Sequence, residues 1–516
     1  MSFGHDSYDL YFLALFHLTA LSKDHVVFVT PCLERKTQDS GGKSKPGQTP
    51  RSEEAHGSPA ESERLQRKTT AEFNRANLIE HIFNLKKGCR VGYSAFWAIT
   101  IFMIAYGFII SESVHRTISA MLGGMALIFL GVVDQSAAIR YIDFNTLGLL
   151  IGMMIIVSIT AQTGLFRFIS IWAAKLVGGR PIALLIVFSL ITAIGSAFLD
   201  NVTTVLLVVP MTFSIARQLQ ISPMPFLMAE IFMANIGGTA TMIGDPPNIM
   251  IGSAVKDIDF LDFITNLTPV ILLITAAVLV LLGFIYRKGL HVRSDARAVL
   301  ADLNAADEID DRSLLIKSVT VLTLTIAAFF VHQQLGVGTA TIALAGAFLL
   351  LLLTGERYLE QALAGVEWTT IFFFVGLFVL VGGLVESGVI GRFAHLALQL
   401  TGGRLVPSTF LVLWMSAFAS AFIDNIPFVA TMIPLIKEMG SLGLSNLDPL
   451  WWSLSLGACL GGNGLLIGAS ANLVVAGIAG KEGHPISFIA FMKIGLPVML
   501  LSIVIASVYV WLRYLV

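Results

Sequence analysis

The chain has 516 residues, of which 55% are hydrophobic and only 13% are charged, and its mean hydropathy is +0.80. These values exclude a set of soluble domains and predict an all-α polytopic membrane protein. The formal net charge is -1, and charges crowd into short connections and the N-terminal tail, so we expect no nucleic-acid-binding face. Cys32, Cys89 and Cys459 have no metal-binding spacing, so they are interpreted as incidental thiols.

Residues 1–90 form a polar tail that differs from the rest of the chain. The stretch from Lys36 to Thr70 is rich in Ser, Gly, Pro and charge, which predicts disorder. The apolar run from Tyr8 to Ser22 is shorter than an ordinary membrane span, and it lacks a convincing cleavage site for a signal peptide. At most it adds one weak extra span.

Apolar stretches of spanning length recur from Ser94 onward. The predicted spans lie near residues 94–112, 117–133, 144–163, 226–251 and 266–286, and again near 314–332, 339–355, 368–387, 451–478 and 495–512. They define a first transmembrane repeat at 91–290, a cytoplasmic linker at 291–313 and a second repeat at 314–516.

An Asp-Asn motif occurs twice, as SAFLDNV at Ser196 to Val202 and as SAFIDNI 224 residues later. The same offset pairs Asp143 with Glu367, Gly164 with Gly388, Pro210 with Pro434, Gly244 with Gly468 and Asn248 with Asn472. Apolar bias alone does not align Gly, Pro, Asp and Asn at one spacing. The sequence therefore predicts an internal duplication.

Each Asp-Asn motif lies in the middle of a long segment, 182–217 in one half and 405–440 in the other. Each segment is long enough to enter the membrane and turn back, which predicts two re-entrant helical hairpins. Five spans and one such hairpin give an odd number of crossings, so the two repeats should be inverted. The basic residues from Arg167 to Lys317 then gather on the cytoplasmic side, whereas Lys86, Lys87 and Arg90 conflict with that rule.

A second pair of motifs interrupts one span in each repeat, IGGTATMIGDPPN at Ile236 to Asn248 and LGGNGLLIGASAN at Leu460 to Asn472. The adjacent prolines of the first cannot donate backbone hydrogen bonds, and the glycines of the second weaken the helix. Broken helices at matching positions are typical of a transporter binding site. Tight helix packing is the alternative, and we prefer it only for isolated glycines such as Gly152 and Gly376.

Asp200 and Asp424 are the first candidates for chemistry, because a carboxylate at membrane depth usually faces a protein interior or a wet cavity. We expect them to be ionisable groups of the translocation path, and the alternative is that they only cap the hairpin helices. For the single interior residues Glu230, Glu386 and His332, placement at a helix interface or a helix end is the favoured interpretation.

At these motifs the chain resembles the ion-transporter superfamily that includes arsenite efflux permeases, a class of bacterial sodium/proton antiporters and the melanosomal P protein. Citrate and dicarboxylate transporters are more distant members. The resemblance covers roughly residues 91 to 516 and rests on FLDNVTTVLL, GDPPN and SAFIDN. It implies a scaffold and a moving transport domain in each protomer, and a homodimer.

Carried over by motif, the resemblance implies a binding site at the two hairpin tips and the two helix breaks. Its residues are Asp200, Asn201, Thr203, Thr204, Thr239, Thr241, Asp245, Asn248, Asp424, Asn425, Asn463, Ser470 and Asn472. The repeats differ where Asp245 becomes Ala469 and where Thr203-Thr204 becomes Pro427-Phe428. Most acidic ligation is therefore expected from the first half, with a sodium site at Asp200 and Asp424 and no other metal or cofactor.

These features predict a secondary active transporter of the plasma membrane, either an arsenite or antimonite efflux protein or a sodium/proton antiporter. The four motif segments contain Asp but no Arg or Lys, so a polycarboxylate would meet like charge. A citrate or dicarboxylate transporter remains an alternative, as does an ion channel. No enzyme motif occurs in a usable context, so an enzyme is not expected.

Overall fold

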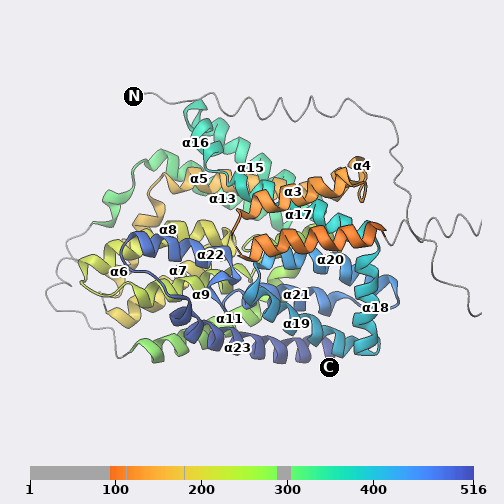
Figure 1. Ribbon diagram of the computed structural model, residues 1–516. Coiled ribbons are helices and arrows are strands. Elements are labelled where there is room, and N and C mark those ends of the chain that lie inside the picture. Colours follow the sequence, from red (N-terminus) through yellow and green to blue (C-terminus); the bar gives the residue numbers. More distant parts are fainter. Residues whose placement is uncertain (1–92, 112, 179, 288–303) are drawn as a thin grey trace, which may run out of the picture. The chain divides into compact units, whose positions relative to one another are not determined.

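The computed structural model describes residues 93–111, 113–178, 180–287 and 304–516. These residues form helices joined by short turns, and this part of the chain contains no strand, so the all-α prediction is confirmed. Val91–Val516 form one compact unit (Figure 1). The predictions for the polar tail and for most of the 291–313 linker lie outside the described residues.

The first repeat begins with the helix Tyr93–Ser111 and continues through the hairpin and the broken helix to α11. Its further helices are α3 (Arg116–Phe129), α4 (Gln135–Tyr141), α5 (Phe144–Ala161), α6 (Leu165–Leu176), α7 (Pro181–Phe198), α8 (Asn201–Gln218), α9 (Met224–Gly238), α10 (Pro246–Ala254) and α11 (Phe260–Tyr286).

The second repeat follows the same order. After the short helix η1 (Ala305–Glu308) of the linker, its elements are α13 (Arg312–Phe330), α14 (His332–Leu335), α15 (Thr339–Thr354), η2 (Glu356–Tyr358), α16 (Leu359–Ala364), α17 (Trp368–Glu386), α18 (Val389–Thr401), α19 (Leu405–Phe422), α20 (Asn425–Ser441), α21 (Asp448–Gly461), η3 (Leu466–Gly468), α22 (Ser470–Lys481), α23 (Phe488–Val510) and η4 (Trp511–Leu515). The hairpin arms α7 and α19 coincide at both ends when shifted by 224 residues.

Both predicted helix breaks are present. The first break separates α9 from α10, which starts at Pro246, and the second separates α21 from α22. A proline in the first helical turn costs no hydrogen bond, because the first backbone N–H groups of a helix have no partner within it. The spans predicted at 226–251 and 451–478 are therefore each two helices that meet inside the protein.

The starts of the last helices of each repeat were predicted too late. α11 begins at Phe260 rather than near 266, and α23 begins at Phe488 rather than near 495. Asp259 and Asp262 form a capping box that fixes the polar first turn of α11, and the Ser487 hydroxyl caps α23. An apolarity criterion does not detect these polar first turns.

Eight helices of the described chain are long and apolar enough to cross a membrane, and α3, α9 and α15 are shorter apolar helices. The eight are the helix Tyr93–Ser111, α5, the hairpin arm α7 and α11 in the first repeat, and α13, α17, the hairpin arm α19 and α23 with η4 in the second. Large apolar side chains such as Phe129, Val280 and Leu352 are exposed on the outer surface, as expected for contact with lipid. The protein is therefore an integral, multi-pass membrane protein.

The two repeats interlock through helices at equivalent positions. α3 packs against α17 and α15 packs against α5, so the second span of each repeat contacts the third span of the other (Figure 1). Likewise, α8 contacts α22 and α20 contacts α10. Each hairpin turns back inside the protein, which is the arrangement that the prediction of inverted repeats requires; the orientation of the repeats in the membrane stays a prediction.

Two glycines allow the closest of these approaches. A Cβ added at Gly376 of α17 would lie 2.5 Å from the carbonyl carbon of Ala120 in α3. The equivalent Cβ at Gly152 of α5 would lie 2.5 Å from the carbonyl carbon of Ala343 in α15. The interpretation of Gly152 and Gly376 as packing glycines is therefore confirmed.

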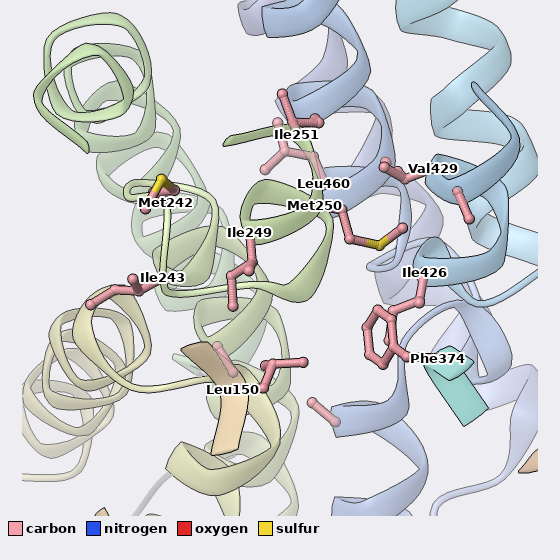
Figure 2. Close-up of a cluster of buried hydrophobic side chains, with 14 of the residues drawn as sticks. Leu150, Met242, Ile243, Ile249, Met250, Ile251, Phe374, Ile426, Val429 and Leu460 are labelled. Carbon is pink, nitrogen blue, oxygen red and sulfur yellow. The ribbon is translucent and has the colours of Figure 1, made fainter. Parts of the chain in front are cut away.

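An apolar shell surrounds the short helix α10. Figure 2 shows Ile249, Met250 and Ile251 of α10 among apolar side chains of both repeats. Those neighbours are Leu150 of α5, Phe374 of α17, Ile426 and Val429 of α20, and Leu460 of α21. The shell gives the polar groups at the N-terminus of α10 a surrounding of low polarity, which strengthens their electrostatic interactions.

Candidate functional site

Asp245 is the carboxylate at which the two hairpin tips meet. Its Oδ1 and Oδ2 accept from Asn425 Nδ2 at 3.3 and 3.2 Å, and its Oδ1 accepts from Asn201 Nδ2 at 3.4 Å. Asn201 and Asn425 are equivalent residues of the two tips, and Asp245 has no exposed surface. One residue of the first break thus joins the tips of both repeats near the middle of the helical unit.

Four helices begin around this carboxylate. A cavity of about 20 Å³ is lined by Asn201 of α8, Pro246 of α10, Asn425 of α20 and Ser470 of α22, each at the start of its helix. A helix N-terminus carries about half a positive charge, so the four together offset about two negative charges. A cavity of this size holds on the order of one water molecule or one bare ion.

Asp200 and Asp424 both cap the hairpin helices that follow them. Asp200 Oδ1 accepts from Thr203 N at 2.8 Å, and its Oδ2 accepts from the Thr203 hydroxyl. Asp424 Oδ1 accepts from Ile426 N at 3.1 Å. Both aspartates also line cavities, Asp200 the small cavity and Asp424 a larger one. Their capping role is thus present, and their role in translocation remains a prediction.

Asn248 and Asn472 stabilise the two breaks in the same way. Asn248 Nδ2 donates to the carbonyls of Thr239 and Thr241 at 3.2 and 2.9 Å. Asn472 Nδ2 donates to the carbonyls of Gly462 and Leu465 at 2.8 and 3.1 Å. Each amide satisfies carbonyls that the break frees from helical hydrogen bonding. These two asparagines therefore support the site and line neither of its cavities.

Thr239, Thr241 and Asn463 donate their side-chain hydrogen bonds to backbone carbonyls of the chain, so these groups are already occupied. The Thr239 hydroxyl donates to the Asn235 carbonyl at 2.7 Å, and the Thr241 hydroxyl donates to the Ala197 carbonyl. Asn463 Nδ2 donates to the Phe232 carbonyl at 3.4 Å. Only Thr204 differs, since its buried hydroxyl has no hydrogen-bond partner. Of the thirteen predicted site residues, six line the two cavities: Asp200, Asn201, Asp245, Asp424, Asn425 and Ser470.

Asn235 is a site residue that sequence reasoning missed. Its Nδ2 donates to Asn463 Oδ1 at 2.9 Å and to Asn472 Oδ1 at 3.0 Å, and its Oδ1 accepts from Asn201 Nδ2 at 3.3 Å. It therefore connects the first hairpin tip to the second break. The signal was an amide in an apolar helix one residue before the IGG motif.

Arg116 brings a basic residue to the site, although the four motif segments themselves contain none. It lies in the first turn of α3, outside the four motif segments, and its Nη1 is 2.9 Å from Asp424 Oδ2. Because α3 packs against α17, its N-terminus reaches the second hairpin tip. Glu367, the N-cap residue of α17, also lines the small cavity and was likewise missed.

The three single polar residues lie at a helix interface or at helix ends, as predicted. Glu230 is buried in α9 and accepts from the Thr212 hydroxyl of α8. Glu386 is the last residue of α17, and His332 is the first residue of α14. Cys459 is a buried free thiol, as expected, whereas Cys32 and Cys89 lie outside the described residues.

Two repeats with paired hairpin tips and paired broken helices around one buried polar centre define a membrane transporter. Residues 106–457 match the CitMHS family, which is described as citrate transporter, and the chain belongs to this family within the ion-transporter superfamily. The predicted resemblance is thus confirmed at the level of the superfamily. Its arsenite branch is untested.

Several relatives support this assignment. An uncharacterized transporter of Mycobacterium tuberculosis is 44% identical over 81% of this chain and 98% of its own length. The P protein of Mus musculus is 36% identical over 81% of this chain and 60% of its own length. The crystal structure of the YdaH transporter of Alcanivorax borkumensis covers 82% of this chain and 98% of its own, with a TM-score of 0.52 and 14% identity. The YdaH likeness concerns the fold alone.

Proposed function

We propose that the protein is a secondary active transporter that exchanges a small inorganic ion or solute for protons or sodium. The observation that carries this proposal is the charge of the polar centre. Asp200, Asp245 and Glu367 line the small cavity and Asp424 borders it through Ser470, whereas Arg116 is its single lining cation. Four helix N-termini offset only part of this negative charge. A sodium ion or a proton would neutralise the remainder.

Arsenite is the second candidate, and the polar uncharged groups favour it. Arsenite is a neutral trihydroxide at physiological pH, so it needs hydrogen-bond partners rather than a cation. Asn201, Asn425 and Ser470 supply amides and a hydroxyl at the cavity. A citrate or dicarboxylate substrate, which the family description suggests, has weaker support, because its carboxylates would face those of the site.

A division into scaffold and transport domain supports the exchange mechanism. We assign α3, α5, α13, α15 and α17, which pack on one another, to the scaffold. The hairpins and broken helices, which also pack on one another, form the transport domain. Movement of the second group against the first would carry the polar centre across the membrane. We further propose a homodimer joined through the scaffold in the plasma membrane.

Everted membrane vesicles provide the test. Recovery of a pH-dye signal on adding sodium is expected for sodium/proton exchange, and accumulation of radiolabelled arsenite is expected for efflux. Robust citrate or succinate transport with neither activity would refute the proposal. Flux that neither saturates nor runs uphill with an ion gradient would indicate a channel instead.

A further inference from the structure

Arg116 links the two groups of helices at the candidate site. Its Nη1 donates to Asp424 Oδ2 at 2.9 Å and to Ser470 Oγ at 2.5 Å, and Ser470 Oγ donates to the same Asp424 oxygen at 2.6 Å. Arg116 belongs to α3 of the scaffold, whereas Asp424 and Ser470 belong to the second hairpin and the second broken helix. Movement between the two groups must therefore break this ion pair.

The location of Arg116 is unfavourable for its own helix. A cation in the first turn faces the positive end of the helix dipole. The guanidinium is held instead by Asp424 and by the ring of Phe373. Arg116 Cζ lies 5.2 Å from the centroid of that ring. This ion pair is less exposed than those of Arg167 with Glu308 and Asp310 and of Arg217 with Glu482, with 28% and 12% of its two side chains exposed.

Arg116 also separates two cavities. The small cavity of about 20 Å³ and an open cavity of about 370 Å³, the vestibule, are both lined by Arg116 and Ser470. Apolar residues such as Ile109, Phe422 and Val474 form most of the vestibule wall. A guanidinium that leaves Asp424 can enter the vestibule, which Arg116 already lines.

The groups that face this ion pair are mostly acidic. Glu367 comes from the start of α17, Asp200 from the first hairpin tip and Asp245 from the first break. His115 lines the vestibule beside Arg116, and the Tyr106 hydroxyl donates to the Pro427 carbonyl at 2.6 Å on the same hairpin. Without the guanidinium, the carboxylates around Asp424 would attract another cation.

We propose that Arg116 is a tethered cation that occupies Asp424 while no mobile cation is bound there. A cation arriving through the vestibule displaces the guanidinium, and Arg116 returns when that cation leaves. The residue thereby sets the affinity and the specificity of the Asp424 site for cations. This inference rests on the proposed function in one respect, the choice of sodium as the cation.

The purified full-length protein allows a test that does not depend on transport. A ligand that binds only the folded state raises the melting temperature, so the temperature shift over a sodium series, with choline keeping ionic strength constant, reports sodium binding. Arg116→Gln is expected to lower the half-saturating sodium concentration about tenfold, which is about 1.4 kcal/mol. Arg116→Lys keeps the charge and is expected to lie closer to the unmodified protein.

Arg217→Gln is the matched control. Arg217 also forms an ion pair between the repeats, with Glu482 after α22, but neither residue lines the vestibule or the small cavity. This control should leave the half-saturating concentration unchanged, and Asp424→Asn should abolish the sodium effect. An unchanged concentration in both Arg116→Gln and Arg116→Lys would overturn the proposal, as would the absence of any sodium effect in all of these proteins.

The sodium-binding experiment and the vesicle experiment can fail independently of each other. Sodium binding that Arg116 opposes, without flux in vesicles, would contradict the transport proposal and leave the tethered cation intact. Sodium-driven flux without any change of sodium affinity in the Arg116 variants would contradict the tethered cation and leave the transport proposal intact. If Arg116→Gln does not fold, Arg116→Met, which also removes the charge and keeps an apolar side chain, carries the comparison, and an unchanged half-saturating sodium concentration in it would overturn the proposal.

Discussion

The two repeats share their backbone plan but differ in the residues at the polar centre. Asp245, Asn235 and Thr203 of the first repeat correspond to Ala469, Cys459 and Pro427 of the second. Asn248 and Asn472, whose amides donate to the free carbonyls of the two breaks, occupy equivalent positions and are asparagine in both repeats. Duplication therefore supplies the geometry of the site and its two tip carboxylates, Asp200 and Asp424, and divergence adds a further carboxylate, Asp245, in the first break alone.

The orientation of the repeats gives an all-or-none prediction. Gln220 lies between α8 and α9, and Ser445 lies at the corresponding turn between α20 and α21. Inverted repeats place these exposed positions on opposite sides of the membrane. In a background where Cys32 and Cys89 are serine, an impermeant thiol reagent should label Gln220→Cys only from the cytoplasm and Ser445→Cys only from outside. Labelling of both from one side would refute the topology.

Asp245→Ala makes the first break resemble the second. The buried amides of Asn201 and Asn425 would lose their shared acceptor, and each loss costs about 1–3 kcal/mol of free energy. We therefore expect transport to fall about a hundredfold. Asp245→Asn separates the loss of charge from the loss of shape. Transport in vesicles and the melting temperature of the purified variants are the measurements. Unchanged transport in both variants would remove Asp245 from the site.

Asp200→Asn and Asp424→Asn test the equivalent tip carboxylates. Asparagine caps a helix about as well as aspartate, so these variants remove charge with little loss of the cap. We expect each to lower transport at least about tenfold, which corresponds to about 1.4 kcal/mol, because each removes one carboxylate charge from the polar centre. Asp259→Asn, the same change at the cap of α11, is the control and should keep transport. Wild-type transport and unchanged pH dependence in both tip variants would leave them as caps only.

The packing glycines should respond equally, because their contacts are equivalent. Gly152→Val and Gly376→Val each force a side chain against the backbone of α15 or α3, and overpacking of this kind costs about 1–3 kcal/mol. Thermal unfolding of the purified variants measures the effect. Gly283→Ala, where an added Cβ meets no atom within 4 Å, is the control. A large loss in only one of the pair would argue against equivalent packing.

The smallest effect concerns a polar pair that the second repeat lacks. Thr212 and Glu230 correspond to Ile436 and Leu454. Replacing both partners of a buried hydrogen bond by apolar groups is nearly neutral, so Thr212→Ile with Glu230→Leu should change stability by about 1 kcal/mol or less. Thr212→Ile alone leaves Glu230 unpaired and should cost about 1–3 kcal/mol. A double variant less stable than the single one would contradict this.

The sequence predicted those features that depend on local chemistry or on the repeat. The prolines of GDPPN and the glycines of LGGNG located both breaks, and the repeated SAFxDN motif located both tips. Arg116, Glu367 and Asn235 escaped prediction because their contacts join distant parts of the chain. Arg116, for instance, meets a residue 308 positions away. Such a meeting depends on how α3 packs against α17, which no local pattern encodes.

The interlocking of α3 with α17 and of α15 with α5 has a consequence for biosynthesis. Membrane helices insert first and associate afterwards. When the first half leaves the ribosome, α3 and α5 have entered the bilayer but their partners have not yet been translated. Their glycine-lined faces must therefore rest against lipid or insertion machinery until the second half arrives. Neither half can complete these helix contacts alone, and the polar centre, which takes residues from both halves, can form only after the second half has been made.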